Sequence, residues 1–207
     1  MILDIHTHRS GLYPLGIEQA LPDSFAPEPG QLYSLGIHPW HIPSDPTDLL
    51  ARLTELAAHP QVAMIGETGI DELKGAPMFL QNQVFAAHIA LSEQLGKPLI
   101  IHCVKAYNSI VQFRKETRAQ QPWIIHGFRG RPSVAQMLLR AGCYLSFGEK
   151  FNAETLRAVP REAIFAETDE SALSIEEIIA RLSEARGEGD LTPLLEQNYT
   201  SLVILDS

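Results

Sequence analysis

Short apolar segments alternate with polar loops and amphipathic stretches along most of this chain. Each apolar segment is rich in Ile, Val, Leu, Tyr or Phe, which is typical of β-strands. Repeated pairs of a strand and an amphipathic helix indicate a parallel sheet. The predicted strands are 2–7, 15–20, 32–37, 62–66, 98–102, 123–127, 143–147 and 163–167. Eight strands in this pattern predict an α/β fold of the TIM-type β/α barrel class.

Helix boundary signals lie between these strands. A helix is expected over 78–95, where Gly96 supplies a stop. Ser174 followed by Glu177 fits a capping box at the start of another helix. Two further helix starts are expected at Asp45-Pro46 and at Arg131-Pro132-Ser133.

The segment 9–31 departs from this alternation, because it is rich in Gly and Pro and has no helical period. We therefore expect the barrel to lack one or two early crossover helices. No linker, internal repeat or low-complexity tract interrupts the chain, so residues 1–207 are predicted to form a single domain.

The composition and length predict a cytoplasmic protein with a full hydrophobic core. The chain has 207 residues, 45% of them hydrophobic, which is enough to bury a full core. No apolar run approaches the ~20 residues that a membrane span needs, and the N-terminus has no basic region of a signal peptide. Cys103 and Cys143 lack a CxxC spacing and are expected to be reduced thiols. Nothing in the pattern points to an obligatory protein partner or to a membrane.

The net charge of -9 argues against broad electrostatic capture of a polyanion, which needs clustered Lys and Arg. The net charge alone does not exclude a polyanion, because it counts every carboxylate as negative. A site whose carboxylates have bound cations is less negative than this sum implies.

Polar side chains follow several of the predicted strands, at the end where the loops of a β/α barrel build an active site. His6 and His8 are two residues apart in the first strand, so both can face the barrel interior and hold one cation. The alternative for this motif alone is a pair of surface histidines at a strand exit.

Four further strand ends carry a possible ligand. Glu67 could bridge two cations, and the alternative is a salt-bridged carboxylate. His102 and His126 each follow three apolar residues, and either alone would suit a hydrogen-bonded core histidine. Asp169 could bind a metal and accept a proton from water, or cap the helix that follows. Together, four histidines and two acids at five strand ends predict a metal centre.

On these motifs the chain resembles the TatD family of metal-dependent hydrolases within the amidohydrolase superfamily. The blocks that carry the resemblance run in order from the DxHxH start at Asp4: Gly36-Ile37-His38-Pro39, Gly-Glu-Thr-Gly-Ile-Asp at 66–71, Ile-His at 101–102, His126-Gly127-Phe128-Arg129-Gly130, Ser146-Phe147-Gly148 and Glu167-Thr168-Asp169. The chain is shorter than the family pattern in the early crossovers and in the loop after Asp169.

The resemblance implies a site with two divalent metal ions, Mg, Mn or Zn. It implies that His6, His8 and Asp169 hold one ion, that His102 and His126 hold the other, and that Glu67 lies between them. It further implies that His38 faces the substrate. The implied activity is hydrolysis of phosphodiester bonds, typically as a deoxyribonuclease, with DNA or a small phosphodiester as substrate.

Basic side chains beyond two of the ligand histidines suit such a substrate. Lys105, Arg129 and Arg131 could hold a phosphate, for which Arg offers a bidentate donor fork, or they could be solvated loop charges. Trp40 and Tyr107 could stack on a base or pack at the surface.

Two other functions fit the same residues. The first is an enzyme of the same superfamily that hydrolyses an amide, a lactone or an ester. The second is a non-enzymatic barrel that keeps a metal for stability or partner binding. The six-residue ligand set favours an enzyme, since a structural zinc site usually has four protein ligands and no open position.

Overall fold

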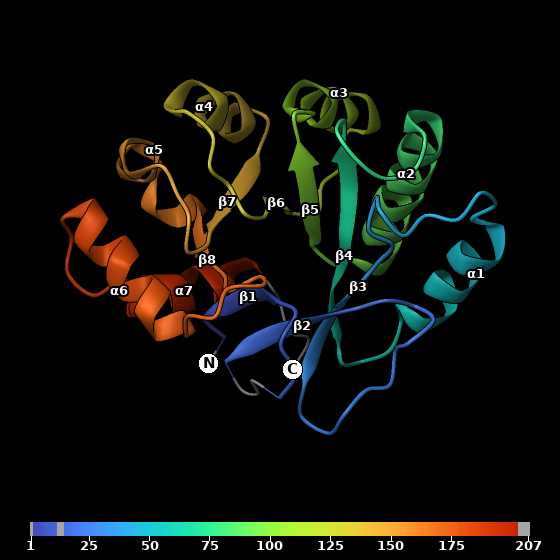
Figure 1. Ribbon diagram of the computed structural model, residues 1–207, viewed down its shortest axis with the longest axis horizontal. Coiled ribbons are helices and arrows are strands. Elements are labelled where there is room, and N and C mark those ends of the chain that lie inside the picture. The colour runs from blue at the N-terminus through green and yellow to red at the C-terminus, as the bar shows by residue number, and fades with distance from the viewer. Residues whose placement is uncertain (1, 12–14, 203–207) are drawn as a thin grey trace.

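A computed structural model describes residues 2–11 and 15–202 of the chain. Eight parallel strands close into a barrel in chain order, because β1 pairs with both β2 and β8 (Figure 1). The strands are β1 (Asp4–Thr7), β2 (Gly16–Ala20), β3 (Leu32–Leu35), β4 (Val62–Asp71), β5 (Leu99–Val104), β6 (Trp123–Ile125), β7 (Cys143–Phe147) and β8 (Ile164–Ala166). Every predicted strand is present, and the predicted TIM-type barrel is confirmed.

The helices lie outside the barrel strands (Figure 1). They are α1 (Thr47–Leu56), α2 (Met78–Leu95), α3 (Tyr107–Thr117), α4 (Pro132–Arg140), α5 (Ala153–Ala158), α6 (Ile175–Arg186) and α7 (Thr192–Leu202), with a short 3-10 helix η1 (Arg161–Ala163). The described residues of the first two crossovers contain no helix, so the prediction of missing early crossover helices is confirmed. None of the described helices has the length and apolarity to span a bilayer.

The helix signals were confirmed with one shift. Gly96 ends α2 in the left-handed conformation, and Ser174 and Glu177 form the capping box of α6. The start of α1 was predicted one residue too early, since the helix begins at Thr47 and Pro46 precedes it. Asp45 still serves this end, because its carboxylate accepts a hydrogen bond from the Thr47 N–H.

Strand β4 is longer than the predicted 62–66, and it runs on to Asp71. This longer strand contains Gly66 and Gly69, which let β4 and β5 approach closely. A Cβ on Gly69, whose φ is 143°, would clash with the carbonyl oxygen of His102. The pairing of Gly69 with His102 and of Asp71 with Val104 therefore continues beyond Glu67.

Two hydrophobic clusters explain why polar groups gather at one end of the barrel. The larger one packs the sheet against the helices, and Cys103 lies against it, outside the barrel as expected. The smaller one includes Ile100 and Ile124, together with Tyr199 of α7. Because alternate strand residues share a face, His102 and His126 lie above these two isoleucines inside the barrel. The interior is thus apolar below and polar at the carboxyl ends of the strands.

A buried polar contact closes the barrel between its first and last strands. Asp4 of β1 accepts hydrogen bonds from both the backbone N–H (2.9 Å) and the hydroxyl (2.6 Å) of Thr168. Burial raises the pKa of Asp4 to about 6, although the Thr168 hydrogen bonds act against it. This contact joins residues 164 positions apart beside the site described below.

His88 of α2 is a buried histidine with a structural role. Its Nε2 accepts a hydrogen bond from the Ile37 N–H at 2.9 Å, so its Nδ1 carries the proton and donates to the Val84 carbonyl at 2.8 Å. The helix is thereby joined to the segment that follows β3. Burial lowers the pKa of His88 from 6.5 to about 4.

Because of His88, the protein is expected to become less stable as the pH falls. Between pH 6.5 and about 4 the unfolded chain binds a proton at His88 that the folded protein does not, so unfolding becomes easier as the pH falls. The shift corresponds to about 3 kcal/mol. Urea unfolding of wild type and His88→Gln between pH 4 and 7 should show a shallower pH dependence in the variant. The exposed His41, changed to Gln, is the control and should keep the wild-type slope. Equal slopes in wild type and His88→Gln would contradict the assignment.

Candidate metal centre

The six predicted ligand side chains lie together at the carboxyl ends of the barrel strands. His6 and His8 come from β1 and the residue after it, and Glu67 comes from β4. His102 lies in β5, His126 directly follows β6, and Asp169 lies in the loop after β8. The structure therefore brings the set into one site, while the role of each residue as a ligand stays a prediction.

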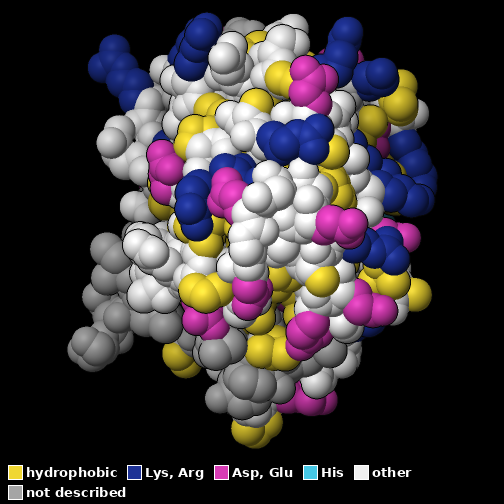
Figure 2. Space-filling model, turned by 90° about the vertical axis from the view of Figure 1, so that its left-hand side faces the viewer, with side chains coloured by type: hydrophobic (Ala, Val, Ile, Leu, Met, Phe, Trp, Pro, Cys, Tyr) yellow, Lys and Arg dark blue, Asp and Glu magenta, His cyan; other side chains and the backbone are white. Residues whose placement is uncertain are grey.

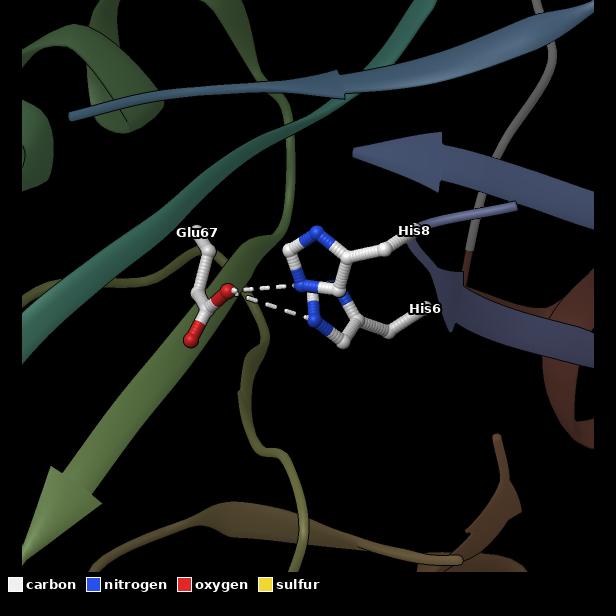
Figure 3. A group of neighbouring side chains, drawn as sticks. All are labelled: His6, His8 and Glu67. Carbon is white, nitrogen blue, oxygen red and sulfur yellow. Dashed lines mark ion pairs between the residues drawn. The ribbon is translucent and has the colours of Figure 1, made fainter. Parts of the chain in front are cut away.

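Glu67 lies at the centre of this set and divides it into two halves. Its Oε2 atom is 3.3 Å from Nε2 of His6 and 3.6 Å from Nε2 of His8, and both imidazoles point at this oxygen in Figure 3. Its Oε1 atom is 2.9 Å from Nδ1 of His102 and 2.8 Å from Nε2 of His126. Each carboxylate oxygen thus faces a different pair of histidines.

The electrostatics of the centre favour an ionised Glu67. Burial acts to raise the pKa of this carboxyl, but His126, His6 and the hydrogen bonds with His102 and His126 hold the pKa well below its ordinary value. In turn, burial acts to lower the pKa of His126, and the adjacent Glu67 and Glu167 carboxylates raise it well above the usual range. The hydrogen bond to Glu67 raises the pKa of His8. Glu67 is therefore held in the ionised form, in which both of its oxygens can bind a cation.

Asp169 completes the half of the site that holds His6 and His8. Its Oδ1 atom is 3.8 Å from Nε2 of His6 and 3.6 Å from Nε2 of His8. The Asp169 backbone donates to the His6 carbonyl and accepts from the His8 N–H, so both histidines share backbone contacts with it. Its φ of 53° is left-handed, a conformation that Asp tolerates better than most residues.

The residues present fit a divalent cation. Among residues 2–11 and 15–202, neither ring nitrogen of the fully buried His6 has a hydrogen-bond partner, which is costly unless another group satisfies them. Imidazole and carboxylate donors suit Zn, Mn and related ions. Three overlapping groups each offer ligand atoms within 4.8 Å of one another: His6, His8 and Glu67; His6, His126 and Asp169; His38, Glu67 and His102.

His38 lies closer to the centre than the sequence indicated. Its Nε2 atom is 3.2 Å from Oε1 of Glu67 and 3.2 Å from Nδ1 of His102. Its Nδ1 atom accepts a hydrogen bond from the Trp40 N–H at 3.1 Å, so the proton of a neutral ring is on Nε2. Burial lowers the pKa of His38, which favours this neutral form. His38 therefore presents an N–H donor to the centre.

Lys105 and Arg129 lie on a groove that opens from the metal centre. The groove has a volume of about 680 Å³ and is also lined by Trp40 and Tyr107, as well as by the predicted ligands His102 and His126. On the face over α5 and α6, Figure 2 shows both basic and acidic side chains, with no continuous basic surface. The groove itself places two basic side chains beside the centre, while substrate contact by Lys105 and Arg129 stays a prediction.

Comparison with known proteins assigns the chain to a family. Residues 24–178 match the family model described as TatD related DNase. The chain belongs to the TatD family. The matched segment contains His38, Glu67, His102, His126 and Asp169, while His6 and His8 precede it.

Curated TatD-family relatives carry hydrolase and nuclease names. An uncharacterized metal-dependent hydrolase of Buchnera aphidicola subsp. Baizongia pistaciae is 35% identical over 152 residues, which cover 69% of this chain and 57% of that protein. The uncharacterized metal-dependent hydrolase YabD of Bacillus subtilis is 35% identical and covers 63% of this chain and 56% of its own length. A 3'-5' ssDNA/RNA exonuclease TatD of Musicola paradisiaca is 30% identical, with 80% and 67% covered. The chain spans little more than half the length of the first two relatives.

A solved TatD-family structure has the same fold as this chain. The crystal structure of the TatD homolog YJJV from Escherichia coli K12 superposes with a TM-score of 0.84 and covers 98% of this chain and 97% of its own. At 18% sequence identity this similarity concerns the fold alone.

Two carboxylates of this TatD-family site were not singled out as functional from the sequence. Asp71 lies 3.2 Å from Nε2 of His102, and Glu167 lies 3.3 Å from Nδ1 of His126. Glu167 follows the apolar strand β8 and is fully buried. A carboxylate in such a position needs a partner, and that need was a usable signal in the sequence.

Proposed function

We propose that this chain is a metal-dependent hydrolase that cleaves phosphodiester bonds in DNA or in a small phosphodiester, using two divalent ions, Mg, Mn or Zn. The observation that carries the proposal is the division of the site by Glu67, whose two oxygens each face a different set of donors. A carboxylate in this position suits a bridge between two cations. The nuclease name of one relative supports DNA as the substrate class.

The ligands are assigned by the halves of the site. His6, His8 and Asp169 would hold one ion, and Glu67 would contribute an oxygen to both. His102 and His126 would hold the other ion. Bound cations of this kind lower the pKa of water and stabilise charge on the leaving oxygen.

Four side chains act around the reacting phosphate. Asp169, which is partly exposed at the rim, accepts the proton of the attacking water. His38 donates its Nε2–H to an oxygen of the substrate, since its other ring nitrogen is occupied by the Trp40 N–H. Lys105 and Arg129 bind flanking phosphates in the groove.

A substrate panel tests this function. The protein is stripped with a chelator, then reloaded separately with Mg²⁺, Mn²⁺ or Zn²⁺, and assayed on a single-stranded DNA oligonucleotide, bis(p-nitrophenyl) phosphate, and a set of esters, lactones and amides. Cleavage of the phosphodiesters only after reloading is expected. Metal-dependent turnover of the esters, lactones or amides alone would replace phosphodiesters with a carbonyl substrate. One tightly bound ion with no turnover of any substrate would support a structural metal.

The groove residues are expected to affect substrate binding more than the chemical step. Lys105→Ala and Arg129→Ala should each raise KM for the oligonucleotide by about tenfold, because a charged phosphate contact is lost, with little change in kcat. Lys115→Ala is the control, since this exposed lysine of α3 lies outside the groove. Steady-state kinetics at one fixed ionic strength measure the effect, and an unchanged KM in both groove variants would contradict phosphate binding there.

A further inference from the structure

Two histidines of the proposed metal centre face Glu67 through different ring nitrogens. His102 presents Nδ1 to Oε1 of Glu67 at 2.9 Å, whereas His126 presents Nε2 to the same oxygen at 2.8 Å. A neutral imidazole carries one proton, and only its other nitrogen has a lone pair for a metal. The two rings must therefore be held in opposite tautomers if both are to bind a cation on this side.

A carboxylate stands behind each ring at the nitrogen that points away from Glu67. Oδ2 of Asp71 is 3.2 Å from Nε2 of His102. Oε1 of Glu167 is 3.3 Å from Nδ1 of His126. An ionised carboxylate only accepts hydrogen bonds, so each of these two can hold the ring proton on the nitrogen that points away from Glu67, which leaves the nitrogen facing Glu67 for a cation.

Both carboxylates are held firmly by other donors. Oδ2 of Asp71 accepts from the Trp40 indole N–H at 2.7 Å, and its Oδ1 accepts from the backbone N–H groups of Leu73 and Lys74. Glu167 accepts from the Gly127 N–H at 2.6 Å, in the residue next to His126. Neither carboxylate needs to move in order to orient its histidine.

The positions of both carboxylates follow from the barrel. Asp71 pairs with Val104 in the register that pairs Gly69 with His102, so the extended end of β4 lies beside this histidine. Glu167 directly follows β8, and its N–H donates to the Phe147 carbonyl of β7. The end of β4 and the residue after β8 thus each place a carboxylate beside one of the two histidines.

We infer that Asp71 and Glu167 are positioning residues that fix opposite tautomers of His102 and His126, so that Nδ1 of the first and Nε2 of the second face the cations. This inference rests on the proposed metal centre. Carboxylate partners of this kind orient ligand histidines and raise their basicity, and losing one typically weakens metal affinity about 10- to 100-fold.

The tautomers can be observed directly in the zinc-loaded wild-type protein. Histidine ring ¹H–¹⁵N correlation spectra should show His102 protonated at Nε2 and His126 protonated at Nδ1, with assignments checked by His102→Gln and His126→Gln. The opposite tautomer in either ring would overturn the inference. This measurement needs no carboxylate variant to fold.

Zinc affinity provides the second readout. Isothermal titration of metal-stripped protein should show two ions bound by wild type, and Asp71→Asn and Glu167→Gln should each weaken one of them by about 10- to 100-fold. The controls are Glu72→Gln, which removes an exposed carboxylate from the loop that follows Asp71, and Glu162→Gln, which removes one from η1 before β8. Both controls should keep wild-type affinity.

The outcomes separate this inference from the proposed function. If wild type binds zinc and both carboxylate variants bind it equally well, the positioning role is wrong and the metal centre stands. If Asp71→Asn changes only the thermal unfolding temperature, Asp71 serves the 72–74 turn alone and its positioning role is wrong. If wild type binds no zinc, the proposed metal centre and this inference both fail.

Discussion

Replacing Glu67 with Gln is expected to abolish metal-stimulated hydrolysis, with a fall in kcat/KM on the order of 10³-fold. Glu67 is the buried residue that both halves of the site share, and its two oxygens lie between 2.8 and 3.6 Å from the nearest nitrogens of His6, His8, His102 and His126. An amide has the same shape but no charge to offset two cations. It also offers one acceptor oxygen where the carboxylate offers two.

The measurement combines kinetics with metal analysis. Initial rates on the DNA oligonucleotide are compared for wild type, Glu67→Gln and the exposed control Glu72→Gln, and bound metal is counted by elemental analysis. We expect Glu67→Gln to lose bound metal along with activity, while Glu72→Gln keeps both. An active Glu67→Gln enzyme with a full metal complement would remove the central observation on which the proposed function depends.

Replacing Asp169 with Asn is the second change with a large expected effect. Its carboxylate lies at the rim, 3.6 Å from Nε2 of His8, and its side chain is 29% exposed, so it can reach both an ion and the attacking water. Loss of a general base typically costs 10²- to 10⁴-fold in rate, and we expect a fall in kcat of about that size. KM should change little, because the groove residues are intact.

Pre-steady-state and steady-state kinetics on the same oligonucleotide test this assignment. Metal content should remain closer to wild type in Asp169→Asn than in Glu67→Gln, because Asp169 contributes to one half of the site only. A variant that lost both ions would act as a ligand mutant, and one that retained full kcat would show that another group takes the proton.

Local sequence pattern was sufficient for the strands and for most of the candidate ligands. The apolar runs before His102 and His126 predicted strands, and the structure has β5 and β6 there. The period of two in a strand places Ile100 with His102, and Ile124 with His126, on one face. The parallel order of the strands then brings their carboxyl ends to one rim, which is why residues far apart in sequence could be grouped. The cytoplasmic location and the single domain stay predictions.

The pattern was insufficient where two segments must be compared in space. The predicted strand ended at residue 66, whereas the close approach of β5 at Gly66 and Gly69 allows a longer β4. Asp71 is near His102 only because of that register. His38 was expected to face a substrate, and its 3.2 Å distance to Glu67 depends on how the segment after β3 is held.

The sequence by itself determined the β/α barrel, its missing early helices and the collection of imidazole and carboxylate groups at one rim, because hydrophobic periodicity dictates which face and which end of a strand a side chain occupies. Only the tertiary structure decided which oxygen of Glu67 faces which histidine and which nitrogen of each ring is free. Those choices depend on partners that the fold brings together, such as Asp71 of β4 for His102 of β5, and no local pattern encodes the distance between these two residues.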